Sequence, residues 1–153
     1  MPTASATNIV PVSAETAFDF VADYRNIPRL QSQFSSATLA GEVERGQGAV
    51  VELSGRFHGV PMRVKNRIVA FTPPSRLVSV SDGTVLSRNV WEFEPLEGGD
   101  TRVTLTIKYK VAAGPFGKLF TGVASSLFHR EIQGMTDESL QRLRELLAQE
   151  SNP

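Results

Sequence analysis

The sequence predicts an α+β fold in which a run of antiparallel hairpins is followed by a long C-terminal helix. Between about residues 36 and 112, apolar and polar residues alternate with a period of two. Beyond that range, the apolar residues recur at helical spacing. Turn residues separate the alternating runs, so the predicted strands follow one another as hairpins. Hairpins followed by a closing helix are an α+β arrangement.

The N-terminal part predicts one strand and two short helices. Residues 4–12 form the expected strand, which ends near Pro11. Ser13 is a good N-cap, and the apolar residues that follow it form one face of a helix over 13–23. A second helical turn is expected over 26–30, because proline is tolerated near the start of a helix.

Six further strands are expected, each with one dry face and one solvated face. Their ranges are 36–44, 48–59, 61–71, 75–82, 86–95 and 101–112. Alternation is clearest in the last range, where Val103, Leu105, Ile107 and Tyr109 alternate with threonine and basic residues. This pattern is typical of antiparallel strands that pack on one face. With the N-terminal strand, the predicted sheet has seven strands.

The last third of the chain is helical, but its apolar residues form two stripes. The first stripe is Phe116, Leu119, Phe120, Val123 and Leu127, and the second is Phe128, Ile132, Met135, Leu143 and Leu146, with Ser139 inside it. One straight helix cannot bury both stripes against one flat surface, because they point in different directions. We therefore expect a break or kink near 127–134, at Gly134, or a separate lid-like segment before the helix. Alternatively, sheet and loops cover both faces.

Composition limits the classes of protein. A length of 153 residues predicts a single domain over 1–153. The absence of cysteine excludes thiolate catalysis and sulfur-ligated metal sites. Sixteen basic and sixteen acidic residues give zero net charge, so nucleic acid is not an expected partner. Without a secretory signal or an apolar stretch long enough to span a bilayer, we expect a cytoplasmic protein with no integral membrane segment.

No motif for a nucleotide, metal or hydrolase site is present, so the sequence predicts no cofactor and no metal. His58 and His129 are the only histidines, and we interpret both as solvated surface residues. The alternative is that His129 acts as a general base near the mouth of a cavity. Glu92 and Glu94 lie on the solvated face of their strand, so we do not interpret them as an acid/base pair.

The order of these elements resembles the helix-grip superfamily, also called START-like or Bet v 1-like. Three stretches carry the resemblance: Val12-Ser-Ala-Glu-Thr-Ala-Phe-Asp-Phe-Val-Ala-Asp23 with Pro28 soon after, the hairpin from Trp91 to Leu105, and Gly114-Pro-Phe-Gly117. The chain is most similar to the bacterial polyketide cyclase/dehydrase and lipid-transport (SRPBCC) group. The resemblance implies a helix-grip fold, with a seven-stranded antiparallel curved sheet wrapped around a long C-terminal helix and two short helices after strand 1. It also implies an internal cavity.

Members of this group bind lipids, sterols, isoprenoid quinones, hormones or polyketides, and some are cyclases. The residues predicted to bind a ligand here are Phe57, Met62, Val64, Asn66, Ile68, Asn89, Trp91, Phe93, Ile107, Tyr109, Phe120, Phe128 and Met135. The polar members Asn66, Asn89 and Tyr109 are the most informative, because a buried amide without a partner costs about 1–3 kcal/mol. They hydrogen-bond either a carbonyl or hydroxyl of the ligand, or their own neighbours and water.

The leading hypothesis is a carrier or binding protein for a small hydrophobic molecule (lipid, isoprenoid or polyketide-like), held between sheet and C-terminal helix. The molecule would enter between residues 114–127 and the neighbouring loops. One alternative is an enzyme of the polyketide cyclase/dehydrase type, with Tyr109 and the two asparagines orienting an enol or carbonyl. Another is a partner-binding module that acts on a larger assembly through a basic patch on the outer face of the sheet, formed by Arg56, Arg63, Lys65 and Arg67. The residues alone leave these three open.

Overall fold

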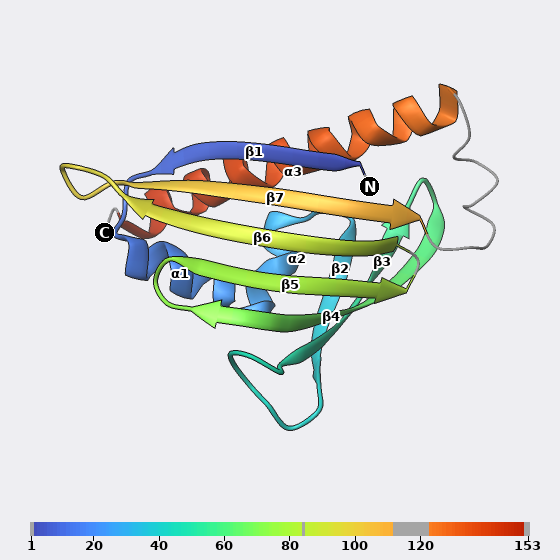
Figure 1. Ribbon diagram of the computed structural model, residues 1–153, viewed down its shortest axis with the longest axis horizontal. Helices are drawn as coiled ribbons and strands as arrows, with labels where there is room; N and C mark the ends of the chain where they lie inside the picture. The colour runs from blue at the N-terminus through green and yellow to red at the C-terminus, as the bar shows by residue number, and fades with distance from the viewer. Residues whose placement is uncertain (1, 84, 112–122, 152–153) are drawn as a thin grey trace.

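The computed structural model describes residues 2–83, 85–111 and 123–151, and it confirms the predicted fold class. In chain order the elements are β1 (Thr3–Val10), α1 (Ala14–Ala22), the 3-10 turn η1 (Tyr24–Asn26), α2 (Ile27–Leu30), β2 (Phe34–Ala40), β3 (Val50–Phe57), β4 (Val60–Thr72), β5 (Arg76–Gly83), β6 (Val85–Pro95), β7 (Thr101–Val111) and α3 (Val123–Ser151). Over this part of the chain, seven antiparallel strands form one sheet in the order β1-β7-β6-β5-β4-β3-β2. The helices lie on one side of it (Figure 1).

The helices after β1 begin and end where local hydrogen bonds allow. Ser13 caps α1, since its hydroxyl accepts from the backbone N–H of Thr16 at 3.2 Å. Asp23 then caps η1 by accepting from the N–H of Arg25 at 3.0 Å. The guanidinium of Arg25 also donates to this carboxylate, which lowers the pKa of Asp23. Pro28 sits at the start of α2, as expected from the sequence.

The edge strand β2 begins with a close approach of two backbones. The N–H of Arg56 donates to the carbonyl of Gln33 at 3.0 Å, and the register shifts between Phe34 and Ser36. At Gly55, an added Cβ would lie 1.8 Å from the Gln33 oxygen, so only glycine fits there. This crossing places Gln33 and Phe34 beside the concave face of the sheet.

The buried residues form two clusters. The larger one, called here the filled core, consists of Val10, Ala14, Ala17, Phe18, Phe20, Leu30, Leu77, Trp91, Phe93, Val103, Leu105, Leu140, Leu143 and Leu147. Phe18 of α1 is fully buried within it and packs edge-on against Phe71 and Phe93, with ring centroids 5.1 and 5.3 Å away. The smaller cluster is Phe34, Val51, Leu53, Met62 and Val64. The filled core therefore joins α1, α3 and the middle strands.

The C-terminal helix α3 is continuous from Val123 to Ser151, so a break near 127–134 is wrong, whereas a kink there stays a prediction. Gly134 lies within the helix on an exposed side, where an added Cβ would meet nothing within 4 Å. No break is needed, because Leu127 at the end of the first stripe is left 55% exposed while Phe128 is buried. The alternative of a separate lid-like segment falls on residues 116–122, which lie outside the described residues.

Gln133 of α3 fastens the helix to the edge strand β1. Its side-chain amide donates to the Ser5 carbonyl at 2.7 Å and accepts from the Ser5 N–H at 3.3 Å. This pairing satisfies backbone groups that an edge strand leaves open.

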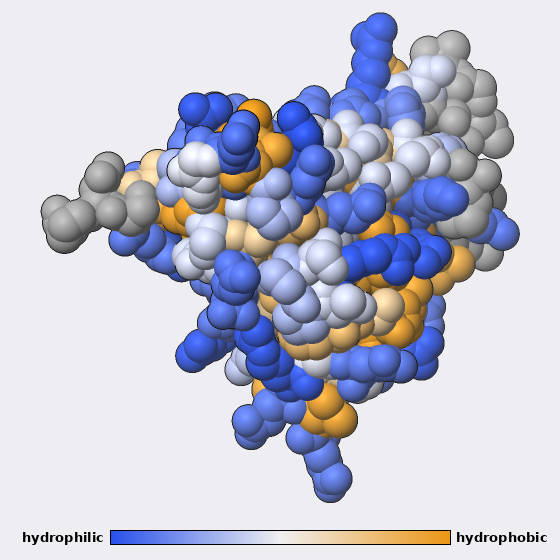
Figure 2. All heavy atoms as spheres, turned by 60° about the vertical axis from the view of Figure 1, so that its left-hand side comes forward, coloured by the Kyte–Doolittle hydropathy of each residue, from blue (hydrophilic) through white to orange (hydrophobic). Residues whose placement is uncertain are grey.

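The face drawn in Figure 2 is mainly hydrophilic, with separate hydrophobic areas. Among the described residues, the exposed large hydrophobic side chains are Ile9, Val43, Val60 and Leu127. None of the helices described here is long and apolar enough to cross a membrane.

Candidate ligand cavity

A cavity lies between the concave face of the sheet, the residues from Val21 to Phe34 and the first half of α3. Its volume is about 150 Å³. A single water needs about 10–15 Å³ of such space, so the cavity has room for an organic molecule rather than for one or two waters. Its wall is mostly apolar, with polar groups in two places.

The structure brings most of the predicted residues together at this cavity. Those in its wall are Phe57, Met62, Val64, Asn66, Ile68, Asn89, Trp91, Ile107, Tyr109, Phe128 and Met135. Phe93 is not in the wall, because Phe18 of α1 covers it and makes it part of the filled core. Phe120 lies outside the described residues. Whether these residues bind a ligand stays a prediction.

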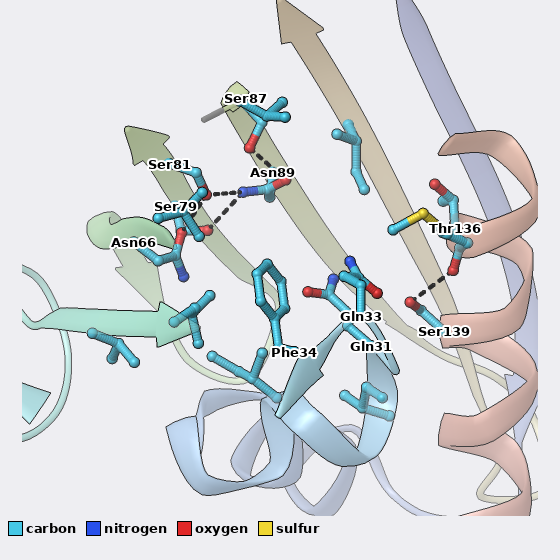
Figure 3. A pocket seen from close by; sticks show the side chains of 18 of the residues that line it. Gln31, Gln33, Phe34, Asn66, Ser79, Ser81, Ser87, Asn89, Thr136 and Ser139 are labelled. Atoms are coloured by element: carbon cyan, nitrogen blue, oxygen red, sulfur yellow. Dashed lines mark hydrogen bonds between the residues drawn. The ribbon is translucent and has the colours of Figure 1, made fainter. Parts of the chain in front are cut away.

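Five polar side chains from β4, β5 and β6 form one group in the wall, called here the strand cluster: Asn66, Ser79, Ser81, Ser87 and Asn89. The sheet register makes them neighbours, since Asn66 pairs with Ser81, Ser81 with Ser87, and Ser79 with Asn89. Figure 3 shows them converging on one side of the pocket.

Hydrogen bonds connect the strand cluster into one network. Ser81 donates to Asn66 Oδ1 at 3.1 Å, and Ser87 donates to Asn89 Oδ1 at 3.3 Å. Asn89 Nδ2 donates to the hydroxyls of Ser79 and Ser81 at 3.2 and 3.4 Å. The interpretation that the asparagines bond to their own neighbours is therefore correct in part. It does not exclude a ligand, because some hydrogens of the network remain unused.

The second polar group lies on the helix side. Thr136 and Ser139 are buried, and their hydroxyls donate to the carbonyls of Ile132 and Met135 in the preceding helical turn, at 2.6 and 2.9 Å. Gln31 and Gln33 also line the cavity, and Figure 3 shows them between Phe34 and α3. The two helix hydroxyls thus have their donors already engaged.

Tyr109 is joined to His129 at the start of α3. Its hydroxyl lies 2.6 Å from His129 Nδ1, and the two rings stack with centroids 6.0 Å apart. The hydroxyl donates in the tautomer that carries the imidazole proton on Nε2. Burial raises the pKa of Tyr109, so the phenol stays neutral in the folded protein. The interpretation of His129 as a solvated surface histidine is therefore wrong, since its ring is half-buried and bonded.

His58 is exposed, as predicted, but it has a partner. It lies in the β3–β4 turn, and its Nε2 is 2.7 Å from a carboxylate oxygen of Glu131 on α3. Next to it, the ring of Phe57 packs edge-on against Phe128, with centroids 5.8 Å apart. Two contacts therefore join the tip of this hairpin to the first half of α3.

Several cavity residues were missed by the sequence analysis. Ser79, Ser81 and Ser87 are small hydroxyls on the inward side of their strands, and Gln31, Gln33 and Thr136 come from elements whose orientation depends on the tertiary fold. For Ser79 and Ser81 a signal existed, because they share strand parity with the buried Leu77. Serine occurs on both faces of sheets, which makes that signal weak.

The chemistry of the wall is neutral. None of the described residues that line the cavity carries a formal charge. Within the described part of the chain, no group of three or more histidine or carboxylate side chains could hold a metal ion. The site can therefore enclose a mainly apolar molecule and offer hydrogen bonds to uncharged polar atoms.

This fold and this cavity define a helix-grip protein of the START-like class. The family model "Polyketide cyclase / dehydrase and lipid transport" matches residues 1–148, and the chain belongs to this family. The family is known for members that bind hydrophobic ligands and for polyketide cyclases and dehydrases. No curated protein matches the sequence.

Solved structures support the fold. TTHA0849 from Thermus thermophilus is similar with a TM-score of 0.78 and 20% identity, covering 99% of this chain and 100% of its own. The Zhui aromatase/cyclase from Streptomyces sp. R1128 has a TM-score of 0.79 at 16% identity, with 99% and 96% covered. A START superfamily protein from Mycobacterium smegmatis has a TM-score of 0.61 at 15% identity, with 88% and 96% covered. At these identities the likeness concerns the fold alone.

Proposed function

We propose that this protein binds one small hydrophobic molecule (a lipid, isoprenoid or polyketide-like compound) in the cavity and acts as a carrier or binding protein. The observation that carries the proposal is the volume of about 150 Å³ between sheet and helix, enclosed by mainly apolar side chains. Protein cores normally reach the packing density of organic crystals and contain few voids larger than a water molecule. A space of this size is therefore unusual for a core and is typical of a binding site.

The energetics of such binding are favourable but limited. Burying about 250 Å² of apolar ligand surface contributes roughly 6 kcal/mol at about 25 cal/mol/Å². Lost translational freedom and ordering offset several kcal/mol of that, so the polar groups of the wall have to contribute for binding to be tight.

Native mass spectrometry of freshly purified protein, followed by denaturation and analysis of the released material, tests the proposal. We expect an apolar adduct at one molecule per chain. Trp91, the only tryptophan, lines the cavity, so its fluorescence should also change when the cavity is filled. An empty protein whose tryptophan emission ignores fatty acids, isoprenoids and aromatic polyketide analogues alike would contradict the proposal.

The second candidate function is an enzyme of the polyketide cyclase/dehydrase type. The specific observation in its favour is the 2.6 Å contact between the Tyr109 hydroxyl and His129 Nδ1 at the cavity wall. An enolisation removes a proton from the carbon next to a carbonyl, and this pair could accept it: the Tyr109 oxygen would take that proton while its own proton passes to His129 Nδ1. Turnover of a polyketide-type substrate that is lost in Tyr109→Phe, while binding persists, would favour the enzyme. Equal turnover in this variant would remove the candidate.

We also propose that the chain works as one domain over 1–153 and in the cytoplasm. The sheet order supports a single unit, because β1 pairs with β7 and α3 packs on β1. Limited proteolysis should give no stable fragment that retains only part of the sheet.

A further inference from the structure

We propose that the ligand carries a neutral carbonyl oxygen, and that the strand cluster holds this oxygen through the side chains of Asn66 and Ser79. This inference rests on the proposed function, because it specifies the ligand of the same cavity. It concerns the chemical class of the ligand and the end of the cavity at which its polar group lies.

The argument begins with the hydrogens of the strand cluster. Three serine hydroxyls and two asparagine amides together carry seven polar hydrogens. Four of them are used within the network: one each from Ser81 and Ser87, and two from Asn89. The two amide hydrogens of Asn66 and the hydroxyl hydrogen of Ser79 are left without a partner among the described residues.

The surplus does not depend on how the Asn66 amide is turned. If the amide is reversed, it donates to Ser81, and the hydroxyl hydrogen of Ser81 becomes the unused one. Four contacts use four of the seven hydrogens in either orientation. The cluster therefore has hydrogens to offer an external acceptor. Four of its five oxygens already receive a hydrogen bond in the orientation described, the exception being the Ser87 hydroxyl.

The unused hydrogens lie at the cavity wall. Ser79 is only 4% exposed and Asn66 is half-buried, and among the described residues no fully buried side-chain nitrogen or oxygen lacks a partner, so the free Asn66 amide nitrogen keeps access to the cavity. A donor left unmade in such a place is unfavourable, whereas an oxygen that keeps one lone pair free costs less. A bound molecule with an acceptor oxygen relieves this cost more fully than one with a donor alone.

The neutral wall selects among acceptor oxygens. A carboxylate or phosphate would be desolvated beside Val64, Ile68 and Leu77 without a cation among the described lining residues. Such burial of an unpaired charge is strongly unfavourable. A ketone, quinone, ester or amide carbonyl accepts two hydrogen bonds without that penalty. The observations therefore favour a neutral carbonyl compound over a free fatty acid.

Isothermal titration calorimetry with four probes of one carbon skeleton tests this inference: 2-acetylnaphthalene, 1-(2-naphthyl)ethanol, 2-ethylnaphthalene and 2-naphthoate. We expect the ketone to bind more tightly than the acid. The ratio of ketone to ethylnaphthalene affinity should fall about tenfold in the Asn66→Leu/Ser79→Ala double variant, as expected for two hydrogen bonds. Comparing this ratio between the wild type and the variant cancels the difference in hydrophobicity between the two probes.

Two further variants keep the test decisive. Thr104→Val removes a hydroxyl on the outer side of β7, where it contacts Thr7 and does not line the cavity, so the ratio should stay at its wild-type value. Ser79→Ala changes one hydroxyl only and replaces the double variant if that chain does not fold. Tightest binding of naphthoate, or a ratio unchanged in the double variant, would overturn the inference. If none of the four probes binds while a fatty acid or an isoprenoid does, this inference fails and the proposed function stands. If none of these compounds binds, both fail.

Discussion

The same antiparallel strands cover both ends of the concave face, but the side chains beneath them differ: one end is packed with apolar residues, and the other borders the cavity. At one end, Phe18 of α1 and Leu143 of α3 are fully buried in the filled core, and the Phe18 ring packs against Phe71 and Phe93. At the other end, the inward side chains are the serines and asparagines of the strand cluster, and a cavity remains. β5 shows the change within a single strand, because Leu77 belongs to the core while Ser79 and Ser81 belong to the cluster.

This difference shows how a fold can keep a void without strain. Small polar side chains on inward positions of three adjacent strands bond to one another, so they do not need α3 to cover them. A larger apolar residue at any of these positions would gain energy by reaching the helix and would close the space. At both ends the inward-facing positions of the strands decide the interior: large apolar residues there give the filled core, and small polar residues there leave the cavity.

Phe18→Ala in the filled core should have the largest effect on stability. Removing this fully buried ring leaves a space between α1 and the sheet, and we expect the free energy of unfolding to fall by about 3–5 kcal/mol. The matched change at the hollow end, Phe57→Ala, should cost about half as much or less, because that ring is half-buried and borders the cavity. Urea denaturation of both variants measures the difference, and equal losses would contradict it.

Valine-to-phenylalanine substitutions should have different effects in the filled core and at the cavity. Val103→Phe in the filled core should destabilise the protein by about 1–3 kcal/mol, because no space accepts the ring. Val64→Phe should cost less than about 1 kcal/mol, since the ring can enter the cavity. It should also abolish ligand binding, which calorimetry would detect. A Val64→Phe protein that binds normally would show that the ligand lies elsewhere.

Tyr109→Phe tests the contact between the cavity wall and His129 of α3 through the pH dependence of stability. Because burial raises the pKa of Tyr109 in the folded state, the folded protein keeps this proton where the unfolded chain loses it. Stability should therefore be complete below about pH 10 and fall as the pH rises from there through the folded pKa. The Tyr109→Phe variant should lack this part of the decline. At neutral pH it should lose about 1 kcal/mol for the bond to His129.

The smallest effect is expected at the surface contact between His58 and Glu131. Both side chains are largely exposed, at 66% and 40%, so His58→Ala should change the free energy of unfolding by less than about 1 kcal/mol. A larger loss, measured by thermal unfolding beside a Glu131→Gln control, would mean that this contact holds the hairpin on α3.

The sequence was sufficient for the fold and for much of the cavity wall. Alternation over 101–111 placed Ile107 and Tyr109 inward because strand parity is a local property of the backbone. Other features depend on how separate elements meet. Phe93 leaves the cavity because α1 lands on it, and Tyr109 reaches His129 because of the rotation of α3 about its axis. Neither contact is encoded in a short stretch of chain.

The pairing of β1 with β7 has a consequence for the order of folding. Thr3 pairs with Lys108, and Gln133 then fastens α3 to Ser5, so contacts join residues more than a hundred positions apart. Topologies of such high contact order fold slowly, because long loops close before their contacts form. On a ribosome, β1 waits for nearly the whole chain. Because the first half of α3 forms one wall of the cavity, we expect the cavity to be complete only after this C-terminal helix has been synthesised.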